Sequence, residues 1–358
     1  MNSETIRLQE AATTPRVLVV DDSVVARTVI ARLVEASGRF SVAETVGSVA
    51  AALRFLAAER VDIILLDVQM PRVDGLTALP DLLAASRGAR VLVVSSSAGD
   101  GAANTVRALA LGAADTLEKP DASAMSARFG QALVERLDRL FERPTARPPV
   151  SAVPTAAPVE PIHVAGEDFD AVAIGASTGG IHALGQLLRA LTPGFRPPIF
   201  VTQHLPASFM PYFAAQLAIL AGRPCEVAVD RLRVRPGRLY VAPGDGHLRC
   251  VSLGGGKVAI RLASDPATSG CLPSVDPMLA SMADVYGQRL LAVVLSGMGR
   301  DGALGARRVR EAGGCVVVQD QATSVVWGMP GAIAAAGDAH AVLPPEEIGR
   351  FMMSRRRA

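Results

Sequence analysis

Short apolar runs alternate along much of this chain with longer stretches of helical period. Many of the runs end in polar residues. In the first third the apolar runs fall at 16–20, 62–67 and 90–96, with a weaker one at 116–119. Later runs fall at 171–174, 197–204, 290–296 and 315–319. Short buried strands that alternate with helices are typical of parallel sheets. The pattern therefore predicts an α/β fold with doubly wound parallel sheets.

One segment, between about Glu142 and Glu167, interrupts this alternation. It is rich in Pro, Ala and Val and has neither a helical nor a strand period. Such segments prefer extended, semi-rigid conformations, so we predict an interdomain linker at 141–167. The linker would separate a domain at 15–140 from a second at 168–352. A chain of 358 residues is also long enough for two hydrophobic cores.

The composition excludes several classes of protein. Half of the residues are hydrophobic and a fifth are charged, as in soluble globular proteins. The net charge of +2 gives no support to nucleic-acid binding, and no apolar run reaches the roughly 18 residues of a membrane span. The cysteines are widely spaced, without a C-x-x-C motif or a secretory signal, and indicate unpaired thiols in a reducing cytoplasm. They are Cys225, Cys250, Cys271 and Cys315.

Polar side chains follow the predicted strands of the first domain. Asp21 and Asp22 come after the first strand, Asp67 ends the second, Ser95 the third and Lys119 the fourth. The carboxyl ends of parallel strands share one edge of the sheet, so these residues should share a pocket. Three carboxylates together favour an oxygen-loving cation such as Mg²⁺. A single Asp at such a place could equally be a helix N-cap, but four matched strand ends argue for a site.

With these residues in place, the first domain resembles a response-regulator receiver domain of flavodoxin-like fold. The resemblance implies that Asp67 accepts a phosphoryl group and that Asp21 and Asp22 help it hold Mg²⁺. It implies further that Ser95 is the switch hydroxyl and that Lys119 contacts the phosphoryl oxygens.

The loop after the phosphoacceptor strand carries the resemblance further. The segment 65–76, LLDVQMPRVDGL, matches the family's phosphoacceptor loop, although Gln69 stands where relatives often carry an acidic residue. Pro120 would follow a cis peptide bond. A receiver domain is regulatory: its phosphorylation controls another part of the protein. The resemblance implies a chemotaxis histidine kinase as phosphodonor.

The stretch AVAIGASTGG, Ala171–Gly180, opens the second domain with a buried strand, a glycine-rich turn and a helix. Ser177 then lies where ligands bind in open α/β sheets. Three interpretations compete: a serine nucleophile, a dinucleotide-binding turn and a plain tight turn. A short-chain dehydrogenase would need Tyr-x-x-x-Lys. The chain has none, because its tyrosines are followed four residues later by Gln216, Gly244 and Leu290.

A serine nucleophile needs a base, and four histidines lie outside the predicted linker. His204 closes the strand 197–204, at the sheet edge where Ser177 should lie. His247, in the loop VAPGDGHLR, is a rival that the sequence does not exclude. His182 falls on the helix after Ser177 and is interpreted as a surface or packing residue. No strand ends beside His340.

The base in turn needs a carboxylate to orient it. Asp301 follows the strand 290–296 in a glycine-rich segment, and Asp320 follows the strand 315–319. Both remain open on this argument. The predicted order Ser177, His204, Asp301 differs from that of α/β-hydrolases, but triads are recognised by role.

The second domain resembles the catalytic domain of the CheB family, the chemotaxis protein-glutamate methylesterases, which has a Rossmann-like fold. The matching segments are IGASTGG (174–180), TQH (202–204), PSVD (273–276), LSGMGRDG (295–302) and QDQATSVVWGMP (319–330). The resemblance implies Ser177 as nucleophile, His204 as base and Asp301 as its carboxylate. It implies demethylation and deamidation of chemoreceptors without a cofactor at this site, and control by phosphorylation.

Two details and two alternatives remain at this stage. The backbone N–H groups at Thr178 and Met298 are candidates for an oxyanion hole. Cys271 and Leu272 precede PSVD where a basic residue is expected. A receiver coupled to a DNA-binding output would need a helix-turn-helix and a basic face, for which the sequence gives no support. A hydrolase that acts on another acyl substrate is not excluded.

Overall fold

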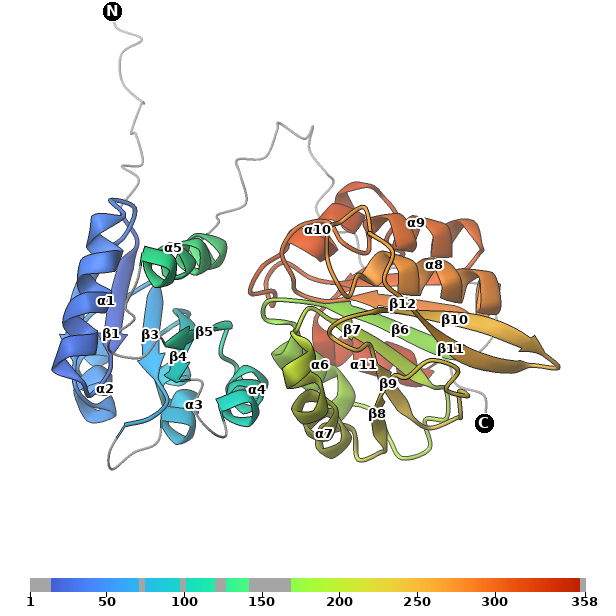
Figure 1. Cartoon of the computed structure of the whole chain (residues 1–358), viewed down its shortest axis with the longest axis horizontal. Helices are drawn as coiled ribbons and strands as arrows, with labels where there is room; N and C mark the ends of the chain where they lie inside the picture. Colours follow the sequence, from blue (N-terminus) through green and yellow to red (C-terminus); the bar gives the residue numbers. More distant parts are fainter. Residues whose placement is uncertain (1–13, 71–74, 97–100, 120–126, 142–168, 355–358) are drawn as a thin grey trace, which may run out of the picture.

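The computed structural model describes residues 14–70, 75–96, 101–119, 127–141 and 169–354. These residues form two α/β domains that lie side by side (Figure 1). The predicted linker lies almost wholly outside the described residues. Each domain has a parallel sheet covered by helices on both faces, as the hydrophobic pattern predicts.

The first domain has a five-stranded sheet in the order β2-β1-β3-β4-β5. Helices α1 and α5 pack on one face and α2, α3 and α4 on the other. The elements are β1 (Arg16–Val20), α1 (Val24–Ala36), β2 (Ser41–Val46), α2 (Val49–Ala58), β3 (Ile63–Asp67), α3 (Gly75–Ala85), β4 (Arg90–Ser96), α4 (Gly101–Leu111), β5 (Asp115–Lys119) and α5 (Ala127–Phe141).

Local sequence explains where the first two helices begin. The side chain of Ser23 accepts a hydrogen bond from the backbone N–H of Ala26, and Ser48 does the same for Ala51. Each serine therefore satisfies an N–H group that has no partner within its helix. The acidic turn that contains Asp21 and Asp22 is thus held between a buried strand and a capped helix.

The second domain has a seven-stranded parallel sheet in the order β14-β13-β12-β6-β7-β9-β8. Its first half contains β6 (Ala171–Ala176), α6 (Gly180–Arg189), β7 (Ile199–Gln203), the 3₁₀ turn η1 (Ala207–Phe209), α7 (Met210–Ala221), β8 (Cys225–Val227) and β9 (Leu239–Val241). Its second half contains β10 (His247–Gly254), β11 (Lys257–Ala263), α8 (Val275–Tyr286), η2 (Gly287–Arg289), β12 (Leu290–Val294), α9 (Ala303–Glu311), β13 (Cys315–Gln319), α10 (Gly328–Ala335), β14 (Ala341–Leu343) and α11 (Pro345–Ser354).

Two apolar layers hold this second sheet. Helices α6, α7 and α11 bury one face, while α8, α9 and α10 and the antiparallel hairpin β10–β11 bury the other. Strands β6, β7, β12 and β13 are buried at every position. Continuous burial explains why they read as unbroken apolar runs in the sequence.

The domains contact each other through α4 and the turn that follows it. Helix α4 packs against α6, α7 and η1. The N–H of Gly179 donates to the carbonyl of Ala114 at 3.1 Å, and Nδ1 of His182 lies 3.2 Å from the carbonyl oxygen of Ala110. In Figure 1, α4 accordingly lies between the first sheet and the helices α6 and α7. The first domain therefore lies directly against the turn that contains Ser177.

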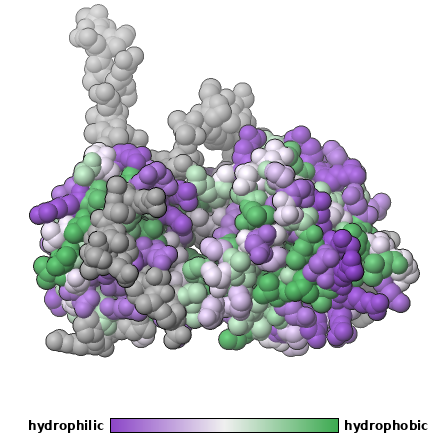
Figure 2. Space-filling view, in the orientation of Figure 1, coloured by the Kyte–Doolittle hydropathy of each residue, from purple (hydrophilic) through white to green (hydrophobic). Residues whose placement is uncertain are grey.

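None of the described helices is both long and apolar enough to cross a bilayer. Figure 2 shows hydrophilic and hydrophobic residues interspersed over both domains on the face it presents.

Candidate active site

The strand order of the second domain brings Ser177, His204 and Asp301 to one edge of the sheet. Strand β6 lies between β7 and β12, with Ala176 paired to Gln203 and Gly175 to Val294. Ser177 and His204 follow directly after β6 and β7, and Asp301 lies in the loop after β12. The order of neighbouring strands reverses at β6, which is where open α/β sheets bind ligands.

The turn after β6 requires glycine. Gly179 has a φ of +76°, and a Cβ there would lie 2.5 Å from Cβ of Val325. A Cβ at Gly180 would lie 2.6 Å from Cβ of Ala176. The N–H of Ser177 donates to the carbonyl of Ser296 at 3.0 Å and fixes the turn to the loop after β12. Ser177 is thereby presented at the N-terminal end of α6.

His204 and Asp301 form a close pair, with 2.7 Å between Nε2 and Oδ2. Burial favours the neutral ring and lowers the pKa of His204. The hydrogen bond to Asp301 and the neighbouring Cys271 outweigh it and raise that pKa to about 9. Burial likewise raises the pKa of Asp301. Hydrogen bonds from His204, Ser274 and the backbone of Val275 lower it to about 2. The ring is thus held as a hydrogen-bond donor to a carboxylate.

Asp301 is fixed by the segment that leads into α8. Its Oδ1 accepts from Oγ of Ser274 at 2.6 Å, and its Oδ2 accepts from the N–H of Val275 at 2.8 Å. Its Oδ1 also accepts from the N–H of Gly302 at 3.1 Å. Asp301 is only 2% exposed and has little access to water. These donors supply the hydrogen bonds that a buried carboxylate needs.

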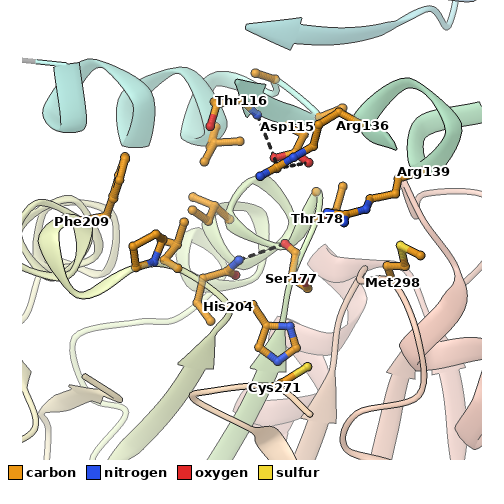
Figure 3. Close-up of a pocket in the computed structure, with 18 of the residues that line it drawn as sticks. Asp115, Thr116, Arg136, Arg139, Ser177, Thr178, His204, Phe209, Cys271 and Met298 are labelled. Carbon is orange, nitrogen blue, oxygen red and sulfur yellow. Dashed lines mark hydrogen bonds and ion pairs between the residues drawn. The ribbon is translucent and has the colours of Figure 1, made fainter. Parts of the chain in front are cut away.

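Nδ1 of His204 is the ring nitrogen that Asp301 does not use. Figure 3 shows the ring between Ser177 and Cys271. Among the hydrogen bonds of the described residues, none joins Oγ of Ser177 to this ring. Hydrogen bonds of this kind are often long in the absence of substrate. Thr178 and Met298 line the same cleft, and the N–H of neither donates to another described residue.

The rival residues have other partners. Nδ1 of His247 accepts from the N–H of Ser274 at 2.9 Å, and its Nε2 lies 2.8 Å from the carbonyl oxygen of Asp265. Both nitrogens thus have backbone partners, and Nδ1 helps to hold Ser274, which orients Asp301. Asp320 accepts from the N–H of Thr323 at 3.3 Å in its own loop. Among the hydrogen bonds of the described residues, none joins either side chain to Ser177 or His204.

The two remaining histidines also bond to the backbone. Nδ1 of His340 accepts from the N–H of Val316 at 3.0 Å, and burial lowers its pKa. His182 lies on α6, where one ring nitrogen bonds to Gln186 of the same helix and the other to the carbonyl of Ala110 in the first domain. The sequence pointed to the PSVD segment but not to the hydrogen bond that Ser274 within it donates to Asp301. A buried serine next to a cis Leu272–Pro273 bond gives no periodic signal.

Ser177 lies in a cleft of about 650 Å³ that both domains line. From the first domain, Asp115 and Arg136 reach its rim, joined by two hydrogen bonds of 2.6 Å, and Arg139 lies beside them (Figure 3). From the second domain, the lining includes Ser177, His204, Cys271, Leu272 and Met298. The cleft that contains Ser177 is therefore formed by residues of both domains.

A second cluster lies at the carboxyl edge of the first sheet. Oxygens of Asp21, Asp22 and Asp67 all lie within 4.8 Å of one another, and Nζ of Lys119 is 2.6 Å from Asp21 and 3.0 Å from Asp67. Burial raises the pKa of Asp67, opposed by Lys119. Three carboxylate donors fit the oxygen preference of Mg²⁺. The side chain of Ser95, together with Pro120, lies outside the described residues.

Comparisons with known proteins agree with this architecture. Residues 172–352 match the CheB methylesterase family and residues 17–129 match the response regulator receiver domain. The chain is 40% identical to a protein-glutamate methylesterase/protein-glutamine glutaminase of Paramagnetospirillum magneticum, an alignment that covers 94% of this chain and 95% of the relative. A relative of the same description from Caulobacter vibrioides is 41% identical, over 96% and 99%.

A solved structure supports the second domain. The CheB methylesterase catalytic domain of Thermotoga maritima matches with 36% identity and a TM-score of 0.50, covering 53% of this chain and 99% of that one. Both halves of the chain thus have a known counterpart, in the same order as in the full-length relatives. The chain belongs to the CheB methylesterase family and carries a response-regulator receiver domain ahead of the methylesterase domain.

Proposed function

We propose that this protein hydrolyses glutamyl methyl esters on chemoreceptors and deamidates receptor glutamines, with Ser177, His204 and Asp301 as a catalytic triad. The pairing of His204 with the buried Asp301, directly beside the strand end that presents Ser177, carries the proposal. The names of the full-length relatives supply the substrate class. Adaptation of the chemotactic response would be the outcome in the cell.

The chemistry follows from these positions. His204 takes the hydroxyl proton of Ser177 through Nδ1 as Oγ attacks the acyl carbon of the ester, and Asp301 stabilises the resulting imidazolium. The N–H groups of Thr178 and Met298 stabilise the oxyanion. The imidazolium returns its proton to the leaving oxygen, and methanol departs. Water, deprotonated by the same ring, then releases glutamate from Ser177; a glutamine substrate releases ammonia instead.

The receiver domain would control this reaction by covering the cleft. The carbonyl of Ala114 already accepts the hydrogen bond that Gly179 N–H offers beside Ser177. Asp67 is the proposed phosphoacceptor, with a histidine kinase as donor. Asp21, Asp22 and Asp67 would hold Mg²⁺, which when bound neutralises charge on the phosphoryl oxygens. Lys119, which contacts Asp67, would bind the phosphoryl oxygens once Asp67 is phosphorylated. Ser95 is the proposed switch hydroxyl.

Replacing the nucleophile tests the proposal. Ser177→Ala should lower methanol release from methyl-labelled receptors by about 10⁴-fold or more, because the remaining groups cannot form an acyl-enzyme. Phosphorylation of Asp67 by a small phosphodonor should be unchanged, which is the control for folding. Asp320→Asn is the matched control for a carboxylate outside the triad and should keep its activity. Methanol release by Ser177→Ala at the original rate would exclude the assignment.

A further inference from the structure

Cys271 lies against the pair formed by His204 and Asp301. One ligand atom from each of the three residues lies within 4.8 Å of the others. Cys271 stands where the family resemblance leads us to expect a basic residue. Its side chain is partly exposed and lines both the cleft that contains Ser177 and a neighbouring cavity of about 510 Å³. A sulfur, a nitrogen and an oxygen donor therefore meet beside the cleft, with Cys271 on the side that solvent reaches.

The other cysteines provide a contrast within the same chain. Cys250 and Cys315 are buried, and burial raises the pKa of Cys225, a partly exposed residue, to about 12. Within the described part of the chain, none of these three shares a metal-binding cluster with a histidine or a carboxylate. Cys225 thus serves as a matched control for an accessible thiol that has no such neighbours.

We propose that Cys271 Sγ, His204 Nε2 and Asp301 Oδ2 form an inhibitory zinc site. Ligand atoms around one tetrahedral zinc lie roughly 3.2–3.7 Å apart, given bonds of about 2.0–2.3 Å. The three donors lie at most 4.8 Å apart, so no separation needs to shorten by more than roughly 1.1–1.6 Å to reach this spacing. His204 Nε2 and Asp301 Oδ2, now 2.7 Å apart, would have to separate by roughly half an ångström. Zinc binding and the His204–Asp301 hydrogen bond therefore exclude each other.

The donor set selects the metal. Thiolate and imidazole favour Zn²⁺ and similar borderline-soft ions, whereas Mg²⁺ prefers oxygen alone. The cluster of Asp21, Asp22 and Asp67 in the receiver domain has the opposite preference because all of its donors are carboxylates. Mg²⁺ should thus occupy the receiver without affecting the site at Cys271. With three protein donors, the fourth zinc position is left for water.

Zinc at this place would remove the base from the reaction. The metal replaces the proton on Sγ of Cys271 and the proton on Nε2 of His204, and both protons go to solvent. The neutral ring keeps its one proton on Nδ1, the nitrogen that faces Ser177. That nitrogen then has no lone pair for the serine proton. This consequence depends on the proposed function, whereas the zinc site itself does not.

Direct binding is measured on the full chain, freed of metal by chelation, with Co²⁺ as a coloured substitute for zinc. The wild type and Cys225→Ser should show a thiolate-to-cobalt charge-transfer band that stoichiometric zinc removes. Cys271→Ser should lack the band and should bind zinc roughly 100-fold more weakly, since it has lost a direct ligand. Zinc should also protect Cys271, but not Cys225, from alkylation. A band of equal strength in Cys271→Ser would overturn the site.

Inhibition is measured from the rate of methanol release with zinc, divided by the rate of the same variant without zinc. Zinc should inhibit the wild type, Cys225→Ser and Asp67→Asn by at least about tenfold, and a chelator should restore the rate. Cys271→Ser and Cys271→Ala should require roughly 100-fold more zinc. Equal zinc sensitivity in all variants would overturn the inhibitory role. The cobalt band does not depend on esterase activity, so failure of the proposed function is seen separately.

Discussion

At the scale of single residues, we expect the protonation of His204 to determine how activity and stability respond to pH. Its ring is mostly buried, yet Asp301 raises its pKa to about 9, above the 6.5 expected when the chain is unfolded. The charged ring therefore stabilises the fold fully below pH 6.5, and this contribution is lost as the pH rises through about 9. As the proposed base, His204 needs the neutral ring, so we expect activity and stability to depend on pH in opposite directions.

We predict that kcat/KM of the phosphodonor-treated enzyme rises about tenfold per pH unit between pH 7 and 8 and levels off near pH 9. Asp301→Asn should move this limb to lower pH and reduce the maximum by about 10⁴-fold, because the asparagine cannot hold the required tautomer. A pH–rate profile, with urea unfolding at each pH, measures both effects. A profile that is flat from pH 6 to 9 would contradict the prediction.

At the scale of secondary structure, the close packing of β6 on α8 holds the site together. A Cβ on Gly175 would lie 2.4 Å from Cγ1 and 2.8 Å from Cγ2 of Val275. Val275 begins α8, and its N–H donates to Asp301. Displacing Val275 would therefore change both the core and the position of the carboxylate.

Gly175→Ala should destabilise the domain by about 1–3 kcal/mol, as overpacked cores do. It should also lower kcat. Val275→Ala removes both colliding methyl groups, so the double variant should recover part of the loss in stability and in kcat. Urea unfolding and methanol release measure the two quantities. If the double variant loses at least as much unfolding free energy as the two single variants lose together, the collision is not the cause.

The same scale shows how far the sequence predicts the fold. Strands β1, β3, β4, β6 and β12 were predicted within one or two residues because continuous burial leaves an unbroken apolar run. Strand β2 was missed because it is a half-buried edge strand with the mixed composition SVAETV. The hairpin β10–β11 was missed as well, since it lies outside the parallel sheets. The contacts of Ser274 and His247 depend on tertiary packing and leave no pattern in the sequence.

At the scale of the whole molecule, the two domains are held together partly by His182. Its Nε2 accepts from Gln186 at 3.1 Å, so its Nδ1 carries the proton and donates to the carbonyl of Ala110. Burial lowers the pKa of His182, in keeping with a neutral ring. One such hydrogen bond contributes about 1 kcal/mol to the contact between the domains.

His182→Ala should therefore raise the activity of the unphosphorylated enzyme about fivefold and reduce its stimulation by phosphodonor by the same factor. The double variant with Asp67→Asn should keep the raised activity, because opening would no longer require phosphorylation. Methanol release with and without phosphodonor measures both. Unchanged basal activity in a folded His182→Ala protein would argue against a covering role for this contact.

Strand β5 connects the two ends of the proposed control. Lys119 at its end contacts Asp67, while Ala114, the residue before its start, bonds to the turn beside Ser177. Five residues of strand separate these points by roughly 17 Å. A phosphoryl group on Asp67 would thus make no direct contact with the turn beside Ser177. The signal would instead travel as a displacement of the strand, so substitutions that stiffen or loosen β5 should alter the coupling and leave both chemical sites intact.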